Sequence, residues 1–218
     1  MTARTQWTVV LAIVALLGAG LWAATRTLGD EIFPVGIGTR APAFTATGVT
    51  GVDSGAVRTL RDYDGQVVLL NIWATWCAPC REEMPSIQAL HETYGPQGLK
   101  VLAVSIDDAR GEPAIRDFAR EFGLTFDILH EPTGDIQRAY QTTGVPETFI
   151  IGRDGVIQRK QVGHADWNSP GNRALVATLL GVPADAAPAA ADTAGAFGDT
   201  AIGAPGGPAA PAAPAAGR

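Results

Sequence analysis

The only two cysteines of this 218-residue chain lie in one short motif, Cys77-Ala78-Pro79-Cys80. Two intervening residues allow both sulfurs to close a small disulfide ring, a spacing typical of a reversible redox site. A zinc site is the alternative, but it would need a second pair of Cys or His ligands, and the sequence has no such pair. The motif therefore predicts thiol–disulfide exchange, with no metal and no cofactor beyond the Cys77–Cys80 disulfide.

The residues on either side of the motif predict the elements that position it. Residues 67–73 form an apolar run typical of a buried parallel strand, and about 77–94 fit a helix that ends at Gly95. Cys77 would then lie at the helix N-terminus, where the helix dipole and free backbone N–H groups favour a thiolate. We expect Cys77 to be the nucleophile and Cys80 the buried resolving thiol.

The rest of the globular part alternates strands with helices. The expected elements are an opening hairpin at about 43–48 and 58–60, a buried strand at 99–107, an amphipathic helix at 112–122, a short strand at 126–129, a short helix at 136–140, a hairpin with strands at 148–151 and 156–159, and a last helix at 170–180. Parallel strands followed by a hairpin predict an α/β fold, a mixed sheet flanked by helices with an N-terminal hairpin extension.

An apolar stretch of 18 residues, 7–24, begins near the N-terminus and is just long enough to span a bilayer. A cleaved signal peptide is the alternative, but Leu21-Trp22-Ala23 places a large residue where a cleavage site needs a small one. We favour an uncleaved anchor. Arg4 before the stretch weakly predicts that the amino terminus stays inside and the domain faces the periplasm or cell exterior.

Composition divides the chain into five parts. They are a cytoplasmic segment at 1–6, a transmembrane signal anchor at 7–25, a linker at 26–38, the folded domain at 39–182 and an Ala/Pro/Gly-rich tail at 183–218. Repeated Ala-Ala-Pro cannot bury a core, so the tail is expected to be disordered. The net charge of −6 gives no basic patch and excludes nucleic acid as a partner.

The motifs together resemble the thioredoxin superfamily, and more narrowly the membrane-anchored TlpA/ResA/CcmG-type thiol-disulfide oxidoreductases with a redoxin, AhpC/TSA-like domain. The matching segments are 38–44, 67–80, 81–85 and 144–151. The resemblance implies a thioredoxin-like fold and reduction of disulfides in exported proteins, with apocytochrome c as a possible substrate. It also implies resupply by a membrane electron donor.

The resemblance also assigns an acidic residue beside the thiols. Glu83 matches it and lies one helical turn after Cys80. A partly buried Glu83 would have a raised pKa and could move protons during exchange, whereas Glu82 should point to solvent. Thioredoxin carries a buried Asp near the end of the central strand; here that position is Asn71, which cannot titrate and leaves acid–base work to Glu83.

Pro146 matches the cis-proline of the family, and a trans turn proline is the alternative. A cis peptide after Val145 would bring backbone close to the sulfurs, and proline lacks the N–H that a partner strand could pair with. Glu147 is a second acidic candidate for partner selection, with a solvated loop charge as the equal alternative.

The remaining predicted contacts surround the cysteines. Trp76 would shield the disulfide and contact a partner, with a core tryptophan as the alternative, whereas Trp73 belongs to the strand and the core. Ala78 and Pro79 complete the ring of the motif and tune the stability of thiolate against disulfide.

Two other functions are alternatives to disulfide reduction. A Sco-like copper chaperone could use Cys77, Cys80 and His164, although Sco proteins place three residues between their cysteines and this chain places two. A peroxidase would need Pro-x-x-x-Thr-x-x-Cys, and neither cysteine has that context. His91 and His130 are predicted at the surface.

Overall fold

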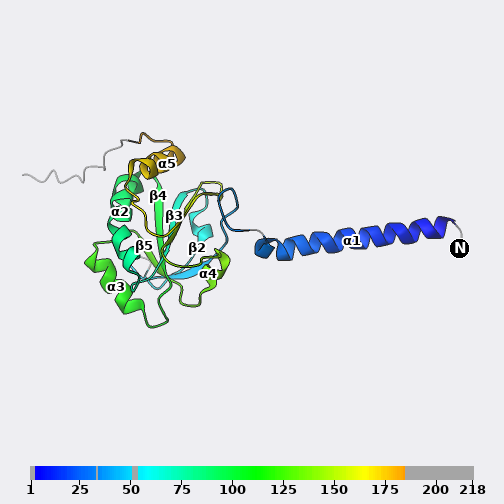
Figure 1. Cartoon of the computed structure of the whole chain (residues 1–218), viewed down its shortest axis with the longest axis horizontal. Coiled ribbons are helices and arrows are strands. Elements are labelled where there is room, and N and C mark those ends of the chain that lie inside the picture. The colour runs from blue at the N-terminus through cyan, green and yellow to red at the C-terminus, as the bar shows by residue number, and fades with distance from the viewer. Residues whose placement is uncertain (1–2, 33, 51–53, 185–218) are drawn as a thin grey trace, which may run out of the picture.

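The computed structural model describes residues 3–32, 34–50 and 54–184, and its domain is built on a seven-stranded sheet of order β2-β1-β5-β4-β3-β6-β7 (Figure 1). The strands are β1 (Thr45–Gly48), β2 (Val57–Thr59), β3 (Val67–Trp73), β4 (Leu99–Ser105), β5 (Asp127–His130), β6 (Glu147–Ile151) and β7 (Ile157–Val162). The helices are α1 (Ala3–Ile32), α2 (Ala78–Tyr94), α3 (Glu112–Glu121), α4 (Asp135–Ala139) and α5 (Pro170–Leu180), with 3-10 turns η1 (Leu60–Tyr63) and η2 (Gly95–Gln97).

The sheet is mixed, as the sequence predicts. Strands β3, β4 and β5 run parallel, whereas β6 and β7 form an antiparallel hairpin beside β3. The opening hairpin of β1 and β2 pairs antiparallel with β5 and extends the sheet at its other edge. The α/β, thioredoxin-like fold with an N-terminal hairpin is confirmed.

Strand β3 is buried on both faces, which explains why all its residues except Asn71 are apolar. Leu69 and Trp73 face the layer formed by α2, α3 and α5, whereas Leu70 and Ile72 face α4 and the segment after α1. Because successive side chains alternate between faces, Asn71 shares the α2 face with Leu69 and Trp73. This alternation places one polar side chain of the central strand directly under the active-site helix.

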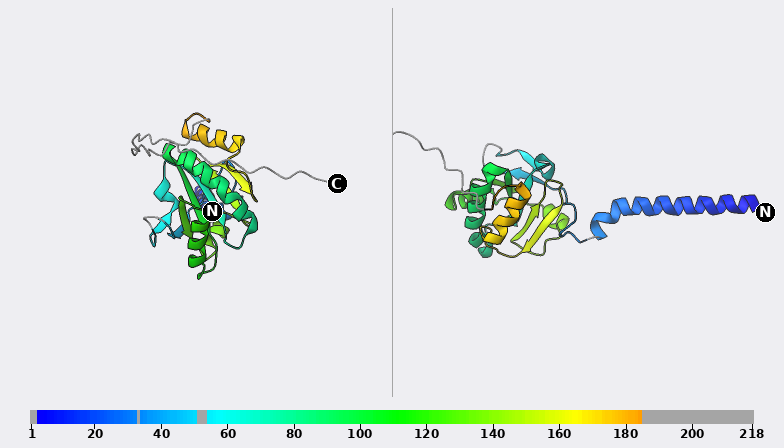
Figure 2. Two further views of the ribbon diagram at one scale, coloured as in Figure 1. Left: turned by 90° about the vertical axis from the view of Figure 1, so that its left-hand side faces the viewer. Right: turned by 90° about the horizontal axis from the view of Figure 1, so that it is seen from above.

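Helix α1 extends away from the domain (Figures 1 and 2). Its segment Gln6–Ala23 has a mean hydropathy of 1.8 and is long and apolar enough to cross a membrane. The domain does not bury this segment. The helix continues to Ile32, seven residues past the predicted span of 7–25 and into the predicted linker. The predicted tail, 183–218, lies outside the described residues except for 183 and 184.

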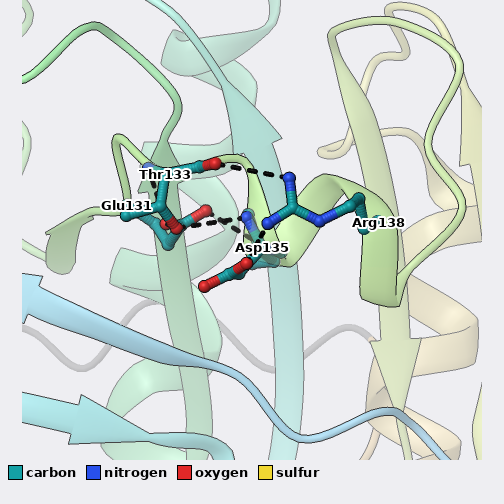
Figure 3. A network of polar contacts seen from close by, with 5 residues as sticks. Glu131, Thr133, Asp135 and Arg138 are labelled. Carbon is teal, nitrogen blue, oxygen red and sulfur yellow. Dashed lines mark hydrogen bonds and ion pairs between the residues drawn. The ribbon is translucent and has the colours of Figure 1, made fainter.

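A buried carboxylate, that of Glu131, lies just before helix α4 and contacts its first turn (Figure 3). Glu131 is 3% exposed; its Oε1 accepts hydrogen bonds from the backbone N–H and hydroxyl of Thr133, and its Oε2 accepts from the backbone N–H of Ile136. Arg138 pairs with Asp135 one turn along the same helix. The Glu131 side chain thus satisfies the backbone N–H of Ile136 in the first turn of this short helix, and the Thr133 hydroxyl accepts from the N–H of Asp135.

The predicted surface position of two histidines is wrong. His130 is the last residue of β5, is 7% exposed, and places its Nε2 3.0 Å from the carbonyl oxygen of Asp107. His91 is partly buried edge-to-face against Phe126, and burial lowers its pKa. The sequence pattern does not show which strand end or helix face the rest of the fold covers.

Candidate active site

The two cysteines lie where β3 gives way to α2. Cys77 is the N-cap residue of α2, and its sulfur accepts a hydrogen bond from the backbone N–H of Cys80 at 3.2 Å. The two sulfurs form a disulfide, Cys77 is 4% exposed and Cys80 is fully buried. Ala78 and Pro79, in the first turn, are exposed. The predicted helix N-terminal position of Cys77 is confirmed, with Cys80 behind it.

The Val145–Pro146 peptide bond is cis, as predicted. It immediately precedes β6, and the carbonyl oxygen of Val145 lies 3.5 Å from the Cys77 sulfur. Pro146 is buried and its carbonyl oxygen accepts from the N–H of Gly163, so this backbone is held from the β7 side as well. The contact brings together two motifs that lie 68 residues apart.

Trp76 is 68% exposed, so the core alternative for it is wrong, whereas Trp73 is fully buried against Phe118. The difference arises because Trp73 ends the strand and Trp76 lies in the turn after it. Asp107, beyond β4, secures this turn: its carboxylate accepts from the backbone N–H of Thr75 at 3.0 Å and from the Thr75 hydroxyl at 2.6 Å. Sequence reasoning missed Asp107.

Glu83 is 1% exposed and lies between the sheet and the loop that follows β7. Its Oε1 accepts from the side-chain amide of Asn71 at 2.7 Å; its Oε2 accepts from the N–H of Ala165 and the indole N–H of Trp167, both at 3.3 Å. Burial raises the pKa of Glu83 to about 7, against the opposing effect of these hydrogen bonds. Glu82, the neighbouring control, is exposed as predicted.

The loop that covers Glu83 was not predicted as part of the site. Trp167 is fully buried, and its backbone N–H donates to the hydroxyl of Ser86 at 2.9 Å. The same hydroxyl donates to the backbone carbonyl of Glu83, one turn back along α2. A lone tryptophan in a polar loop was the available signal, but nothing local connects it to Glu83, 84 residues away.

Glu147 is not a solvated loop charge, so that alternative is wrong. It is the first residue of β6, is 1% exposed, and its Oε1 lies 2.9 Å from the ammonium of Lys160 on β7. Its neighbour Thr148 bonds to Asn71 under α2, so alternation along the strand turns Glu147 toward the opposite face of the sheet. The carboxylate is therefore not at the exposed surface that carries Trp76.

His164 is exposed in the loop after β7, and its charge lowers the pKa of Glu83. Within residues 3–32, 34–50 and 54–184, no group of three or more His, Cys, Asp or Glu side chains could hold a metal ion. The geometry therefore gives no support to a copper site of Cys77, Cys80 and His164.

The site combines a disulfide-bonded cysteine pair at a helix N-terminus, an exposed aromatic side chain beside it and a buried carboxyl whose pKa is raised to about 7. A cysteine at a helix N-terminus is placed where a thiolate is stabilised, and a carboxyl with this pKa can exchange a proton near neutral pH.

Comparison with known proteins agrees with this chemistry. Residues 37–160 match the AhpC/TSA family. Thiol-disulfide oxidoreductase ResA of Geobacillus kaustophilus is 35% identical over 69% of this chain and 82% of its own length. Thioredoxin-like protein YneN of Bacillus subtilis is 36% identical over 72% and 90%, respectively. A structure assigned as thiol:disulfide interchange protein DsbE of Chlorobium tepidum superposes with a TM-score of 0.58 at 31% identity, covering 66% of this chain and 97% of that one.

Proposed function

The chain belongs to the AhpC/TSA family and is a thiol-disulfide oxidoreductase of the ResA and DsbE type, and from this premise we propose that it reduces disulfides of exported proteins outside the cytoplasm. One observation carries the proposal: the Cys77–Cys80 pair begins a helix that also holds a buried Glu83 whose pKa is about 7. A carboxyl with that pKa exchanges its proton readily at neutral pH.

In the first step, the thiolate of reduced Cys77 attacks one sulfur of the substrate disulfide. A bond forms between Cys77 and that sulfur, the substrate S–S bond breaks, and the second substrate sulfur leaves as a thiolate. The N-terminus of α2 stabilises the attacking thiolate through its dipole and through the backbone N–H of Cys80.

In the second step, Cys80 resolves the mixed disulfide. Its thiol gives a proton to the Glu83 carboxylate, and the resulting thiolate attacks the Cys77 sulfur. The Cys77–Cys80 disulfide forms, the bond between Cys77 and the substrate sulfur breaks, and that sulfur leaves as a thiolate. Two electrons have then passed to the substrate. Protonated Glu83 then returns its proton to solvent or to a departing thiolate.

The partner is held by the surface around the disulfide. Trp76, Ala78 and Pro79 are exposed there, and Val145 is partly exposed beside the cis-proline. Pro146 offers no backbone N–H, so an extended partner segment would pair with the neighbouring carbonyl groups instead. This surface selects partners mainly by apolar contact with Trp76.

The apolar N-terminal helix and the family support a proposal for the location and the substrate. Helix α1 would tether the domain to the membrane with its active site in the periplasm or at the cell exterior. There the substrate would be an oxidised Cys-x-x-Cys-His segment of an apocytochrome c, which must be reduced before haem attachment. A membrane electron donor would then return the Cys77–Cys80 disulfide to the dithiol.

The test is the reduction of an oxidised Cys-x-x-Cys-His peptide by the reduced full-length protein in detergent micelles. We expect reduction at least about tenfold faster than with glutathione disulfide at equal concentration, and complete loss of the reaction in Cys77→Ser. Equal rates for both substrates would remove the haem-attachment assignment. Faster oxidation of the reduced peptide by the oxidised protein would overturn the reductase direction.

A further inference from the structure

Asn71, in the middle of the central strand, forms hydrogen bonds through only one end of its side-chain amide. It is fully buried, and its Nδ2 donates to Glu83 Oε1 at 2.7 Å and to the Thr148 hydroxyl at 2.8 Å. Its carbonyl oxygen, Oδ1, is also buried and has no hydrogen-bond partner among the described residues. A buried amide oxygen without a donor is costly, so its retention beside a titrating carboxyl needs an explanation.

The contacts around Glu83 fit only one of its two protonation states. Asn71, Ala165 and Trp167 all donate to its oxygens, which suits a carboxylate. A protonated Glu83 carries an O–H that must itself donate, and each of these partners presents N–H groups toward it. The acid form therefore needs an acceptor that the present arrangement does not aim at Glu83.

We propose that Asn71 is a positioning residue whose side-chain amide flips, rotating by about 180°, when Glu83 takes up a proton. In the carboxylate state, Nδ2 donates to Glu83, as the structure has it. In the acid state, Oδ1 occupies that place and accepts from the Glu83 O–H. The inference rests on the proposed function for the role of Glu83 in exchange.

Thr148 makes the rotation possible because a hydroxyl can either accept or donate. In the present orientation, its oxygen accepts from Nδ2. After rotation, its O–H can donate to Oδ1, which has two lone pairs and can serve Thr148 and Glu83 together. Each orientation leaves one end of the amide unpaired, so neither is strongly preferred and the proton on Glu83 decides between them.

Within the described part of the chain, the other charged groups on the elements around Glu83 do not supply the missing acceptor. From the loop after β7, His164 acts on Glu83 through its charge. On α2, Arg81 is partly exposed and Glu82 is exposed, and the two sulfurs are joined in a disulfide. Glu147, the charged residue next to Thr148, faces the other side of the sheet with Lys160.

The composition of the chain makes the rotation directly observable. It contains three asparagines, Asn71, Asn168 and Asn172. Selective ¹⁵N-asparagine labelling of the oxidised full-length protein in micelles should therefore give three side-chain NH₂ signal pairs. Asn168, whose Oδ1 accepts from Arg173, and buried Asn172, whose Nδ2 donates to the carbonyl of Asp166, serve as internal references.

We expect the Asn71 pair to titrate with a midpoint near pH 7 as pH is varied from about 5 to about 9. Rotation removes both amide protons from their acceptors, so both proton signals should move upfield together on acidification. In Glu83→Gln, which cannot titrate, the Asn71 pair should stay constant. A shift confined to one proton would show an amide that does not turn, and a titration that survives in Glu83→Gln would also overturn the proposal.

A kinetic comparison tests whether this positioning matters for exchange. Asn71→Leu removes the donor to Glu83 and should move the midpoint of the pH–rate profile upward by about one unit. Asn172→Leu removes another buried amide with an unpaired Oδ1 and should leave the midpoint in place. Equal profiles for both variants would contradict the positioning role. The signal titration needs no turnover, so its result stands even if the reductase assignment fails.

Discussion

Two buried glutamates lie on opposite faces of the same sheet and are stabilised in different ways. Glu147 is paired with the ammonium of Lys160, whose Nζ also donates to the carbonyl oxygen of Val35. Glu83 is surrounded by neutral donors, and burial raises its pKa to about 7. Both carboxyls are 1% exposed, so burial alone does not separate their roles.

The difference shows how one fold can use a buried carboxyl for structure or for proton transfer. A cation beside Glu147 compensates its charge and ties β6 and β7 to the segment after α1. Removing one residue of the pair would leave the charge of the other without its partner. Neutral donors hold Glu83 in place without cancelling the cost of its charge, so its proton stays exchangeable. Substitutions at the two sites should separate these two behaviours.

The largest effect is expected from Lys160→Met. This change leaves the Glu147 carboxylate buried without its cation and should lower the free energy of unfolding by about 3 kcal/mol, measured by denaturant titration. The double variant Lys160→Met/Glu147→Gln should recover most of the loss. The pH–rate profile of exchange should not move, because the pair lies on the face of the sheet away from Glu83. A shifted profile would show that the Glu147–Lys160 pair affects the titration of Glu83, which contradicts their separation.

Glu83→Gln should alter the pH dependence of stability. The folded protein holds the Glu83 proton up to about pH 7, whereas the unfolded chain releases it near its ordinary pKa of 4.5. The contribution of this proton is therefore complete below about pH 4.5 and is lost as pH rises through about 7, a fall of about 3 kcal/mol. Glu83→Gln should lack this fall.

Glu82→Gln is the matched control for that experiment, since Glu82 is its exposed neighbour. It should follow the parent protein in both stability and exchange, whereas Glu83→Gln should also slow exchange by at least about tenfold near neutral pH. Parallel stability curves for the parent and Glu83→Gln between about pH 4 and about pH 8 would be inconsistent with a raised Glu83 pKa.

Trp167→Phe should give a smaller change of the same kind. It removes the indole N–H that donates to Glu83 and should raise the midpoint of the pH–rate profile by about half a unit, since that bond favours the carboxylate. Trp73→Phe is the control, because the buried Trp73 Nε1 has no hydrogen-bond partner in the described part of the chain. The midpoint of the pH–rate profile of Trp73→Phe should stay unchanged. Equal shifts of the midpoint in the two variants would show that lost packing, and not the lost hydrogen bond to Glu83, causes the change.

Trp76→Ala should have the smallest effect on stability, under about 0.5 kcal/mol, because the side chain is 68% exposed. It should instead raise the KM for a peptide disulfide several-fold with little change in kcat. A large loss of stability together with an unchanged KM would remove Trp76 from the partner surface.

Features encoded within a few residues could be predicted from the sequence. The N-cap position of Cys77 and the exposure of Glu82 follow from a strand, a turn and a helix that adjoin one another, whereas the burial of Glu83 is an expectation from the family resemblance. The cis bond before Pro146 came from a motif match rather than from local physics. These features needed no knowledge of which distant segments meet.

Contacts between distant segments could not be predicted in this way. The Trp167 indole reaches Glu83 from a loop with no periodic pattern, and Lys160 meets Glu147 only through the register of β6 against β7. The predicted strand at 99–107 ends at Ser105, because the Ser105 hydroxyl bonds to Asp107 and bends the chain toward Thr75. The contacts of Trp167 with Glu83 and of Lys160 with Glu147 depend on long-range pairing that single residues do not encode.

The most direct test of the account is the reduction potential of the Cys77–Cys80 couple in the full-length protein, measured by equilibration with thiol–disulfide buffers at pH 7. A dedicated reductase requires a value below about −220 mV, toward that of thioredoxin, and this is the result we predict. A value near about −120 mV, that of a strong oxidant, would contradict the account and assign the protein to disulfide donation.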